Sequence, residues 1–342
     1  MNIEKKIAEE LEVREAQVLA AVELLDEGCT IPFIARYRKE KTGSLNDEQL
    51  RTLGTRLTYL RNLEEKREQI LSVIEEQGKL TAQLRSEIMA AETAVALEDL
   101  YRPYRPKRRT RAMMAAEKGL SGLAELLGKR NVSCSPEEAA RNYIAPEKGV
   151  DTVEDALQGA SDILAEQISD NAACRAWIRE RTERKGFLVS AAKDAEAKSV
   201  YEMYYDFRDP VRSVPGYRIL AVNRGEKEKI LSVKIEAPEE EITQYLERKV
   251  IRCDRSDVKQ FLKAVAADSY KRLIAPAIER EVRSALTERA EDGAISVFGK
   301  NLKQLLMQPP IANRVVLGWD PAFRTGCKLA VVDEIGNVLD TA

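Results

Sequence analysis

The chain of 342 residues contains no histidine, so Ser-His-Asp and Cys-His catalysis, imidazole metal sites and histidine proton shuttles are excluded. Its five cysteines are widely spaced and include no C-x-x-C pair, which argues against a zinc site or a redox motif. Uncharged apolar runs stay far below the roughly 18 residues of a membrane span. The first residues are charged and amphipathic, unlike a signal peptide. We therefore expect a cytoplasmic protein with no cofactor and no membrane partner.

The chain is rich in charge of both signs. Charged residues make up 33% of it and apolar residues 44%, while the net charge is only −2. Such a composition is typical of a globular protein with more charge than the average of about a quarter. The length exceeds that of one typical domain, so we expect two or more folded units.

Helical periodicity covers most of the sequence. Between Asn46 and Gly78 there is no proline, and leucines recur at spacings of three and four, which predicts one long amphipathic helix. Ser135, Pro136 and Glu138 form a capping box that predicts a helix start. Apolar periodicity also predicts a single helix from Thr152 to Arg184 and helices from Asp254 to Met307, with a kink at Pro276.

Two segments have the composition of strands. Residues 217–237 read as a β-hairpin whose tip, Asn223 to Lys229, is charged. After the double proline at 309 and 310, Val315 to Trp319 and Lys328 to Val332 read as a second hairpin. With no third strand beside it, the edge of that hairpin would be unpaired, and residues 311–342 would be the least protected from hydrogen exchange.

These patterns predict a mainly α fold: an extended multi-helix body with a small β-hairpin insertion, followed by the first hairpin of an incomplete RNase H-like α/β domain. The predicted domains are a helical, helix-turn-helix-like region at 1–185, a small α+β segment at 186–252, long helices at 253–310 and the truncated domain at 311–342.

The strongest charge feature is a run of six cations within ten residues that contain no acid. We call it the basic strip; it consists of Arg102, Arg105, Lys107, Arg108, Arg109 and Arg111. Pro103 and Pro106 should hold the strip extended, and Tyr101 and Tyr104 alternate with it as stacking surfaces. Such a strip suits a phosphate backbone, of RNA or DNA, without sequence preference. The alternative is that its cations pair with acidic helices, for example around Glu92 and Glu98, and stabilise the fold.

A second basic cluster follows a short apolar segment near the N-terminus. Its members are Arg36, Arg38, Lys39 and Lys41. Pro32 suits the first turn of a short helix whose aromatic and aliphatic residues should face the core. The helix, loop and following long helix resemble a helix-turn-helix element, a motif that is often purely structural.

Asp320 ends the first C-terminal strand, just before a turn. RNase H-like and actin-like folds begin with such a strand, aspartate and turn. Two-metal phosphoryl chemistry needs several carboxylates around ions about 4 Å apart, so Asp320 alone does not supply a site. We expect no catalytic residue, no metal site and no enzyme activity in this chain.

Six blocks of the sequence, in order and spacing, resemble the bacterial Tex family of transcription accessory proteins. They are IPFIARYRKEKTG, LEDLYRPYRPKRRTRAMMAAEKGL, ALQGASDILAEQISDN, RILAVNRGEKEKIL, VFGKNLKQLLMQPP and VVLGWDPAFRTGCKLAVVDEIGNVLDT. The resemblance implies the N-terminal half of a longer protein that continues through a YqgF-type RNase H-like domain, a helix-hairpin-helix region and an S1 RNA-binding domain. It also implies the transcription machinery as a partner.

The sequence departs from the family pattern at two places. Ala322 stands where the family usually has glycine after Asp-Pro, which would crowd a ligand at that loop. Pro215-Gly216-Tyr217 stands where Pro-Ser-His is usual, so the role of that histidine does not transfer.

The sequence is compatible with three functions. The first is a non-catalytic, nucleic-acid-binding transcription accessory factor, in which six strip cations would give a slope of about −5 for log affinity against log salt on duplex DNA. The second is a metal-dependent nuclease or resolvase centred on Asp320. The third is a protein-interaction scaffold in which the strip only stabilises the fold.

Overall fold

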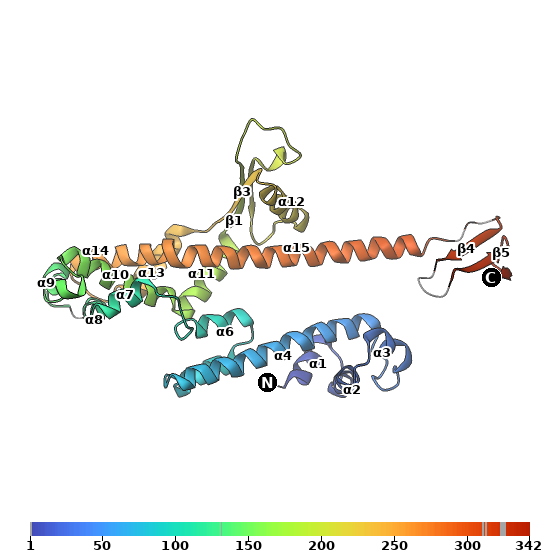
Figure 1. The fold of residues 1–342 in the computed structure, drawn as a ribbon, viewed down its shortest axis with the longest axis horizontal. Helices are drawn as coiled ribbons and strands as arrows, with labels where there is room; N and C mark the ends of the chain where they lie inside the picture. The colour runs from blue at the N-terminus through green and yellow to red at the C-terminus, as the bar shows by residue number, and fades with distance from the viewer. Residues whose placement is uncertain (1, 131, 310, 312, 322–325) are drawn as a thin grey trace. The chain divides into compact units, whose positions relative to one another are not determined.

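The computed structural model describes residues 2–130, 132–309, 311, 313–321 and 326–342, and most of them are helical (Figure 1). The chain forms two compact units: residues 1–185 with 237–280, and residues 186–236 with 281–342. The predicted mainly α fold is confirmed. The four domain boundaries stay predictions, and Pro310 and Ala322 lie outside the described residues.

The first unit is built from helices. They are α1 (Ile3–Leu11), α2 (Glu15–Asp26), α3 (Ile31–Tyr37), α4 (Asp47–Glu76), α5 (Ala82–Ala90), α6 (Ala94–Tyr101), α7 (Arg111–Glu117), α8 (Ser121–Leu127), α9 (Pro136–Arg141), the 3-10 helix η1 (Pro146–Lys148), α10 (Val153–Ser169), α11 (Ala172–Lys185), α13 (Glu239–Val250), α14 (Ser256–Asp268) and the π-helical turn η3 (Ser269–Ile274). Helix α15 (Ala275–Leu306) begins in this unit and continues into the second.

The long helix predicted from residue 46 is α4, and its leucine stripe is buried in the N-terminal core. Asn46 caps it by accepting a hydrogen bond from the Gln49 backbone N–H. Arg67 interrupts the apolar stripe and yet is 1% exposed. Its guanidinium donates to the carbonyls of Ile88 and Ala91 at 3.1 and 2.7 Å. It thereby supplies hydrogen bonds to backbone carbonyls at the C-terminal end of α5 from inside the core.

Helix α10 is the centre of the rest of this unit, because α7, α8, α9, α14 and η3 all pack against it. The prediction of one helix from Thr152 to Arg184 is wrong, since α10 ends at Ser169 and α11 begins at Ala172. The break follows from local capping: the Asn171 side chain accepts a hydrogen bond from the Cys174 N–H at 2.9 Å and starts a new helix. The capping box at Ser135 is confirmed as the start of α9.

The disturbance predicted at Pro276 takes the form of the π-helical turn η3 immediately before it. Proline has no N–H to donate, and a π-turn is one way for a helix to absorb the lost bond. The turn is anchored by Ser269, whose buried hydroxyl donates to the Ala165 carbonyl of α10 at 2.7 Å. The helix predicted from residue 278 to 307 is confirmed within α15.

The second unit contains two three-stranded antiparallel sheets. The first has the order β2-β1-β3, from β1 (Phe187–Ala192), β2 (Asp206–Pro210) and β3 (Leu231–Glu236), with the 3-10 helix η2 (Glu202–Tyr204) before β2 and helix α12 (Gly216–Lys227) before β3 (Figure 1). The predicted hairpin at 217–237 is therefore wrong in its first half. Ile219 and Val222 are buried three residues apart on α12, a helical spacing that their β-branched side chains concealed.

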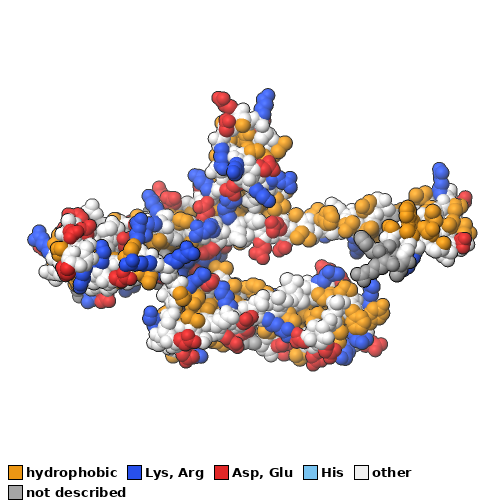
Figure 2. Space-filling model, in the orientation of Figure 1, with side chains coloured by type: hydrophobic (Ala, Val, Ile, Leu, Met, Phe, Trp, Pro, Cys, Tyr) orange, Lys and Arg blue, Asp and Glu red, His pale blue; other side chains and the backbone are white. Residues whose placement is uncertain are grey.

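The second sheet has the order β4-β5-β6, from β4 (Val316–Asp320), β5 (Lys328–Val332) and β6 (Val338–Thr341). The two predicted strands are confirmed, but the expectation of an unpaired edge on β5 is wrong, because β6 pairs with it. Large apolar side chains on this sheet and on the second half of α15 are exposed, including Phe298 and Trp319 at 67% each (Figure 2).

None of the helices described here is both long and apolar enough to cross a membrane.

Gly159 on α10 tests the packing of the first unit. A Cβ at this position would lie 2.2 Å from Cδ1 of Leu120, which is itself buried, so Gly159→Ala should lower the melting temperature. It should do so although alanine favours a helix over glycine by about 1 kcal/mol. The matched change Gly293→Ala on α15 meets nothing within 4 Å and should not destabilise the protein. Equal thermal shifts for the two variants would contradict this account.

The rate of amide hydrogen exchange should differ between the central strands of the two sheets. Strands β1 and β5 are both central, but β1 carries buried Leu188 while β5 has no buried side chain. Exchange of the β5 amides should therefore be faster than exchange of the β1 amides. Equal protection of the two central strands, measured by mass spectrometry, would show that the second sheet is covered.

Candidate nucleic-acid interface

The basic strip connects α6 to α7 in the first unit. Its first part is not extended, as the prolines had indicated: the backbone N–H groups of Tyr104 and Arg105 donate to the Tyr101 carbonyl at 2.9 and 3.0 Å. These bonds continue α6 as a turn, and irregular backbone begins only near Pro106. Tyr101 and Tyr104 pack against the N-terminal core and are only partly exposed, so they are not the open stacking surfaces that were predicted.

Two strip cations are tied to the end of α10. The Arg102 Nε lies 3.3 Å from an Asp170 carboxylate oxygen, and the Lys107 Nζ lies 2.7 Å from Glu166 and also contacts Asp170. Asp170 caps the C-terminus of α10, where the helix dipole disfavours a negative charge unless cations compensate it. Burial raises the pKa of Asp170, although Lys107 and Arg102 act in the opposite direction. These contacts make Arg102 and Lys107 structural anchors.

The other four strip cations face solvent. Arg105 is 63% exposed and lies 3.9 Å from Glu98, and Arg109 is 70% exposed and pairs with Glu117 at 2.7 Å. Exposed pairs of this kind contribute about 0–1 kcal/mol and are readily exchanged for other anions. Arg108 and Arg111 are exposed, and neither has an ion pair with any residue that the structure describes.

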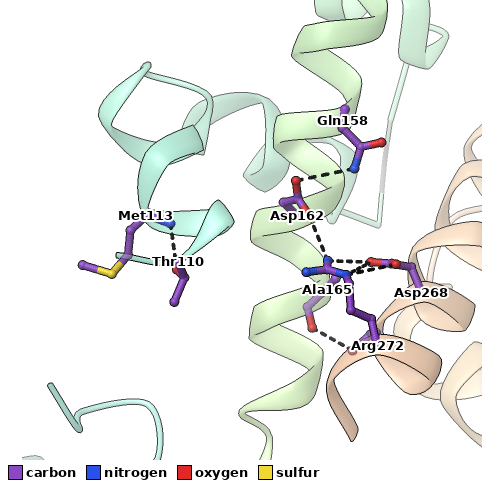
Figure 3. Close-up of polar contacts among 8 residues, drawn as sticks. Thr110, Met113, Gln158, Asp162, Ala165, Asp268 and Arg272 are labelled. Atoms are coloured by element: carbon purple, nitrogen blue, oxygen red, sulfur yellow. Dashed lines mark hydrogen bonds and ion pairs between the residues drawn. The ribbon is translucent and has the colours of Figure 1, made fainter. Parts of the chain in front are cut away.

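The charged groups below the strip are already paired with one another. Arg272 of η3 donates to Asp268 and, at 2.8 Å, to Asp162 of α10 (Figure 3). Beside them the Thr110 hydroxyl accepts a hydrogen bond from the Met113 N–H and caps α7. A small cavity of about 140 Å³ lies between these groups and the strip, with Arg111 at its rim. The cavity is thus lined by paired charges of α10 and η3 as well as by residues of the strip.

The second basic cluster lies on and after α3, whose first turn contains Pro32 as predicted. Ile34 faces the core, but Phe33 is 37% exposed, which corrects the expectation that the aromatic residues are buried. The Arg38 guanidinium lies 5.0 Å from the Phe33 ring centre, a cation–π contact. Arg36, Lys39 and Lys41 are exposed.

Asp320 lies exposed at the end of β4, opposite Lys328 in register. Ala322, two residues further along the chain, lies outside the described residues. Across the described ranges, no group of three or more cysteine, aspartate or glutamate side chains has an arrangement that could hold a metal ion.

The fold also brings together basic residues that the sequence did not single out. They are Lys129, Arg130, Arg248, Arg252, Lys259 and Lys263, which line one cavity of the first unit. No single stretch of sequence could reveal this cluster, because more than 100 residues separate its two parts.

The anchoring role of Lys107 can be tested through the pH dependence of stability. In Lys107→Ala, the partly buried carboxylates of Glu166 and Asp170 lose a partner, and the free energy of unfolding at pH 7 should fall by about 1–3 kcal/mol. A carboxyl whose folded pKa is raised binds its proton more tightly in the folded state, so the deficit should shrink as the pH falls through that pKa. Urea unfolding at pH 7 and pH 5 measures both effects.

Arg108→Ala is the control for that experiment, because Arg108 is exposed and should change stability by less than about 0.5 kcal/mol. Equal destabilisation by the two substitutions would contradict the division of the strip into anchors and free cations.

Comparison with known families matches three segments of the chain. Residues 1–75 match the Tex-like protein N-terminal domain, residues 131–298 the Tex central region, and residues 314–342 the Tex protein YqgF-like domain.

Relatives match nearly the whole chain. "Uncharacterized protein YdcI" of Bacillus subtilis is 46% identical over 98% of the chain and 47% of its own length. "Transcriptional accessory protein Tex" of Neisseria gonorrhoeae is 42% identical over 100% of the chain and 46% of its own length. Human "S1 RNA-binding domain-containing protein 1" is 31% identical over 94% of the chain and 33% of its own length. The chain thus spans less than half the length of these relatives. With three segments in family order and relatives aligned along nearly all of its residues, the chain belongs to the Tex family.

Proposed function

We propose that this chain is a non-catalytic, nucleic-acid-binding part of a transcription accessory factor, and that the four solvent-facing cations of the basic strip contact the phosphate backbone of RNA or DNA. The contact is independent of sequence, because guanidinium groups that pair with phosphates read no base edges. The proposal includes a cytoplasmic location and the transcription machinery as a further partner.

The observation that carries the proposal is the state of Arg108 and Arg111. Both are exposed and without an ion pair within the described chain, although the segment that bears them is fixed to α10 by Arg102 and Lys107. A cation that serves only the fold would be expected to have a carboxylate partner, as those two have. A fixed segment with unpaired cations loses little conformational entropy when it binds a polyanion.

The names of relatives support the same class of function. One is called a transcriptional accessory protein and another an S1 RNA-binding domain-containing protein. No chemical step is assigned to the chain, because Asp320 alone does not supply the set of carboxylates that two-metal catalysis needs.

The geometry lowers the number of phosphates that the strip should neutralise. With Arg102 and Lys107 engaged on α10, four cations remain, and they should contribute about −4 to the slope of log affinity against log salt on duplex DNA, instead of about −5 for six. The strip variant Arg108→Ala/Arg111→Ala should reduce the measured slope by about 2. Fluorescence anisotropy at a series of salt concentrations measures the slope.

A matched control for that titration replaces two exposed lysines of α15, Lys300→Ala/Lys303→Ala, and should leave the slope unchanged. If the strip variant keeps the slope of the unmodified protein and only its melting temperature falls, the strip serves the fold and the assignment is wrong.

A further inference from the structure

A second basic surface lies in the first unit, on residues that are not part of the strip. It is a cavity of about 1000 Å³ between the end of α8 and the α13–α14 pair. We call it the basic groove; its lining is Gly128, Lys129, Arg130, Glu247, Arg248, Ile251, Arg252, Cys253, Asp254, Lys259 and Lys263.

The charge of the groove is strongly one-sided. Six of its lining residues are cationic and two are acidic, in a chain whose net charge is −2. Both acids form ion pairs: Glu247 lies 3.4 Å from Lys263, and Asp254 lies 3.8 Å from Lys259. The other four cations are exposed and make no ion pair in the described part of the chain; they are Lys129, Arg130, Arg248 and Arg252. Such clustering of uncompensated charge costs stability through self-repulsion, so it calls for an anionic partner.

The walls of the groove are held in place by specific contacts. The Arg255 guanidinium donates to the Ser133 carbonyl at 2.8 Å and to both Asp257 carboxylate oxygens at 2.9 Å, which ties the segment after α8 to the start of α14. In the same segment, Gly128 packs against α10, since a Cβ there would lie 3.4 Å from the Leu164 side chain. The four free cations are therefore presented by a fixed frame.

The groove continues into an adjoining cavity of about 380 Å³ that shares Gly128 and Arg252 with it and adds Lys249 and Tyr245. The Tyr245 ring stacks on Trp177, with centroids 3.8 Å apart. Arg181 lies over the Trp177 ring and Lys249 over the Tyr245 ring, at 5.1 and 5.7 Å. Figure 2 shows Lys and Arg side chains over the part of the chain that holds α11 and α13. The two rings stack on each other and each also has a cation over it, so they are already engaged and are not open platforms for a base. This surface therefore favours phosphates over bases.

We propose that the basic groove binds the phosphodiester backbone of a nucleic-acid strand, with Lys129, Arg130, Arg248 and Arg252 contacting successive phosphates. The choice of a polyanion over a small anion follows from the spread of the four free cations over the segment after α8, helix α13 and the connection to α14. The inference rests on the proposed function only for the class of ligand, since the groove and the strip share none of their residues.

The test compares three variants of the full chain. The groove variant is Arg248→Ala/Arg252→Ala, the strip variant is Arg108→Ala/Arg111→Ala, and the control is Lys300→Ala/Lys303→Ala. The probes are fluorescein-labelled single-stranded RNA, single-stranded DNA and duplex DNA of 20 nucleotides per strand, titrated by anisotropy at several salt concentrations. Melting temperatures are measured in parallel and should be unchanged, because both groove arginines are exposed.

The groove variant should lower the salt slope by about 1.4 on a single strand, or by about 1.8 on a duplex, and the control should not. The probe whose slope falls identifies the form of nucleic acid that the groove holds. A smaller salt slope in the groove variant alone would support phosphate binding by the groove and overturn its assignment to the strip. Loss in the strip variant alone would overturn the groove and keep the proposed function.

Two further results would each overturn the groove proposal. One is no change in either variant, which removes both assignments. The other is an unchanged nucleic-acid slope together with lost binding of a labelled poly-glutamate peptide, which would make the groove a site for an acidic protein.

Discussion

The partly buried contact of Lys107 and Arg102 with the carboxylates at the end of α10 determines how the basic strip is presented. Asp170 lies where the helix dipole and burial both disfavour a negative charge, and the two cations compensate it. This contact holds the irregular segment between α6 and α7 against the end of α10. The same contact removes two of the six strip cations from any role at the surface.

The cations of this unit differ in whether they have a partner within the fold: those with a partner are structural, and those without one are available to a ligand. Arg67, Arg272 and Lys107 are tied to carbonyls or carboxylates of neighbouring helices. Arg108 and Arg111 of the strip, and the four free cations of the groove, have no such partner within the described chain. The net charge of −2 does not reveal this difference, because positive and negative charges cancel in the sum. The chain still carries two local concentrations of positive charge. Both concentrations lie on or beside packed helices, which suits a surface that binds a polyanion without rearranging.

Much of the fold could be predicted from the sequence, for reasons that particular residues make plain. The leucine stripe of α4 and the capping box of α9 are local signals, and both are confirmed. The break after Ser169 and helix α12 were missed, because capping by one asparagine and the helical use of Ile219 and Val222 depend on weak preferences that tertiary packing decides. The strip was visible as a run of cations, but its division into anchored and free residues depends on Glu166 and Asp170, about 60 residues away. The groove left no local signal at all, since its cations come from segments that only the fold brings together.

We propose that Arg108 and Arg111 are free to bind phosphate, whereas Arg102 is held by its ion pair with Asp170. The most direct measurement is arginine-specific modification with phenylglyoxal, read by mass spectrometry, with and without single-stranded RNA. Arg108 and Arg111 should react readily in the free protein and become protected when RNA is bound, whereas Arg102 should react slowly in both states. Equal modification of Arg108 and Arg111 with and without RNA would contradict it.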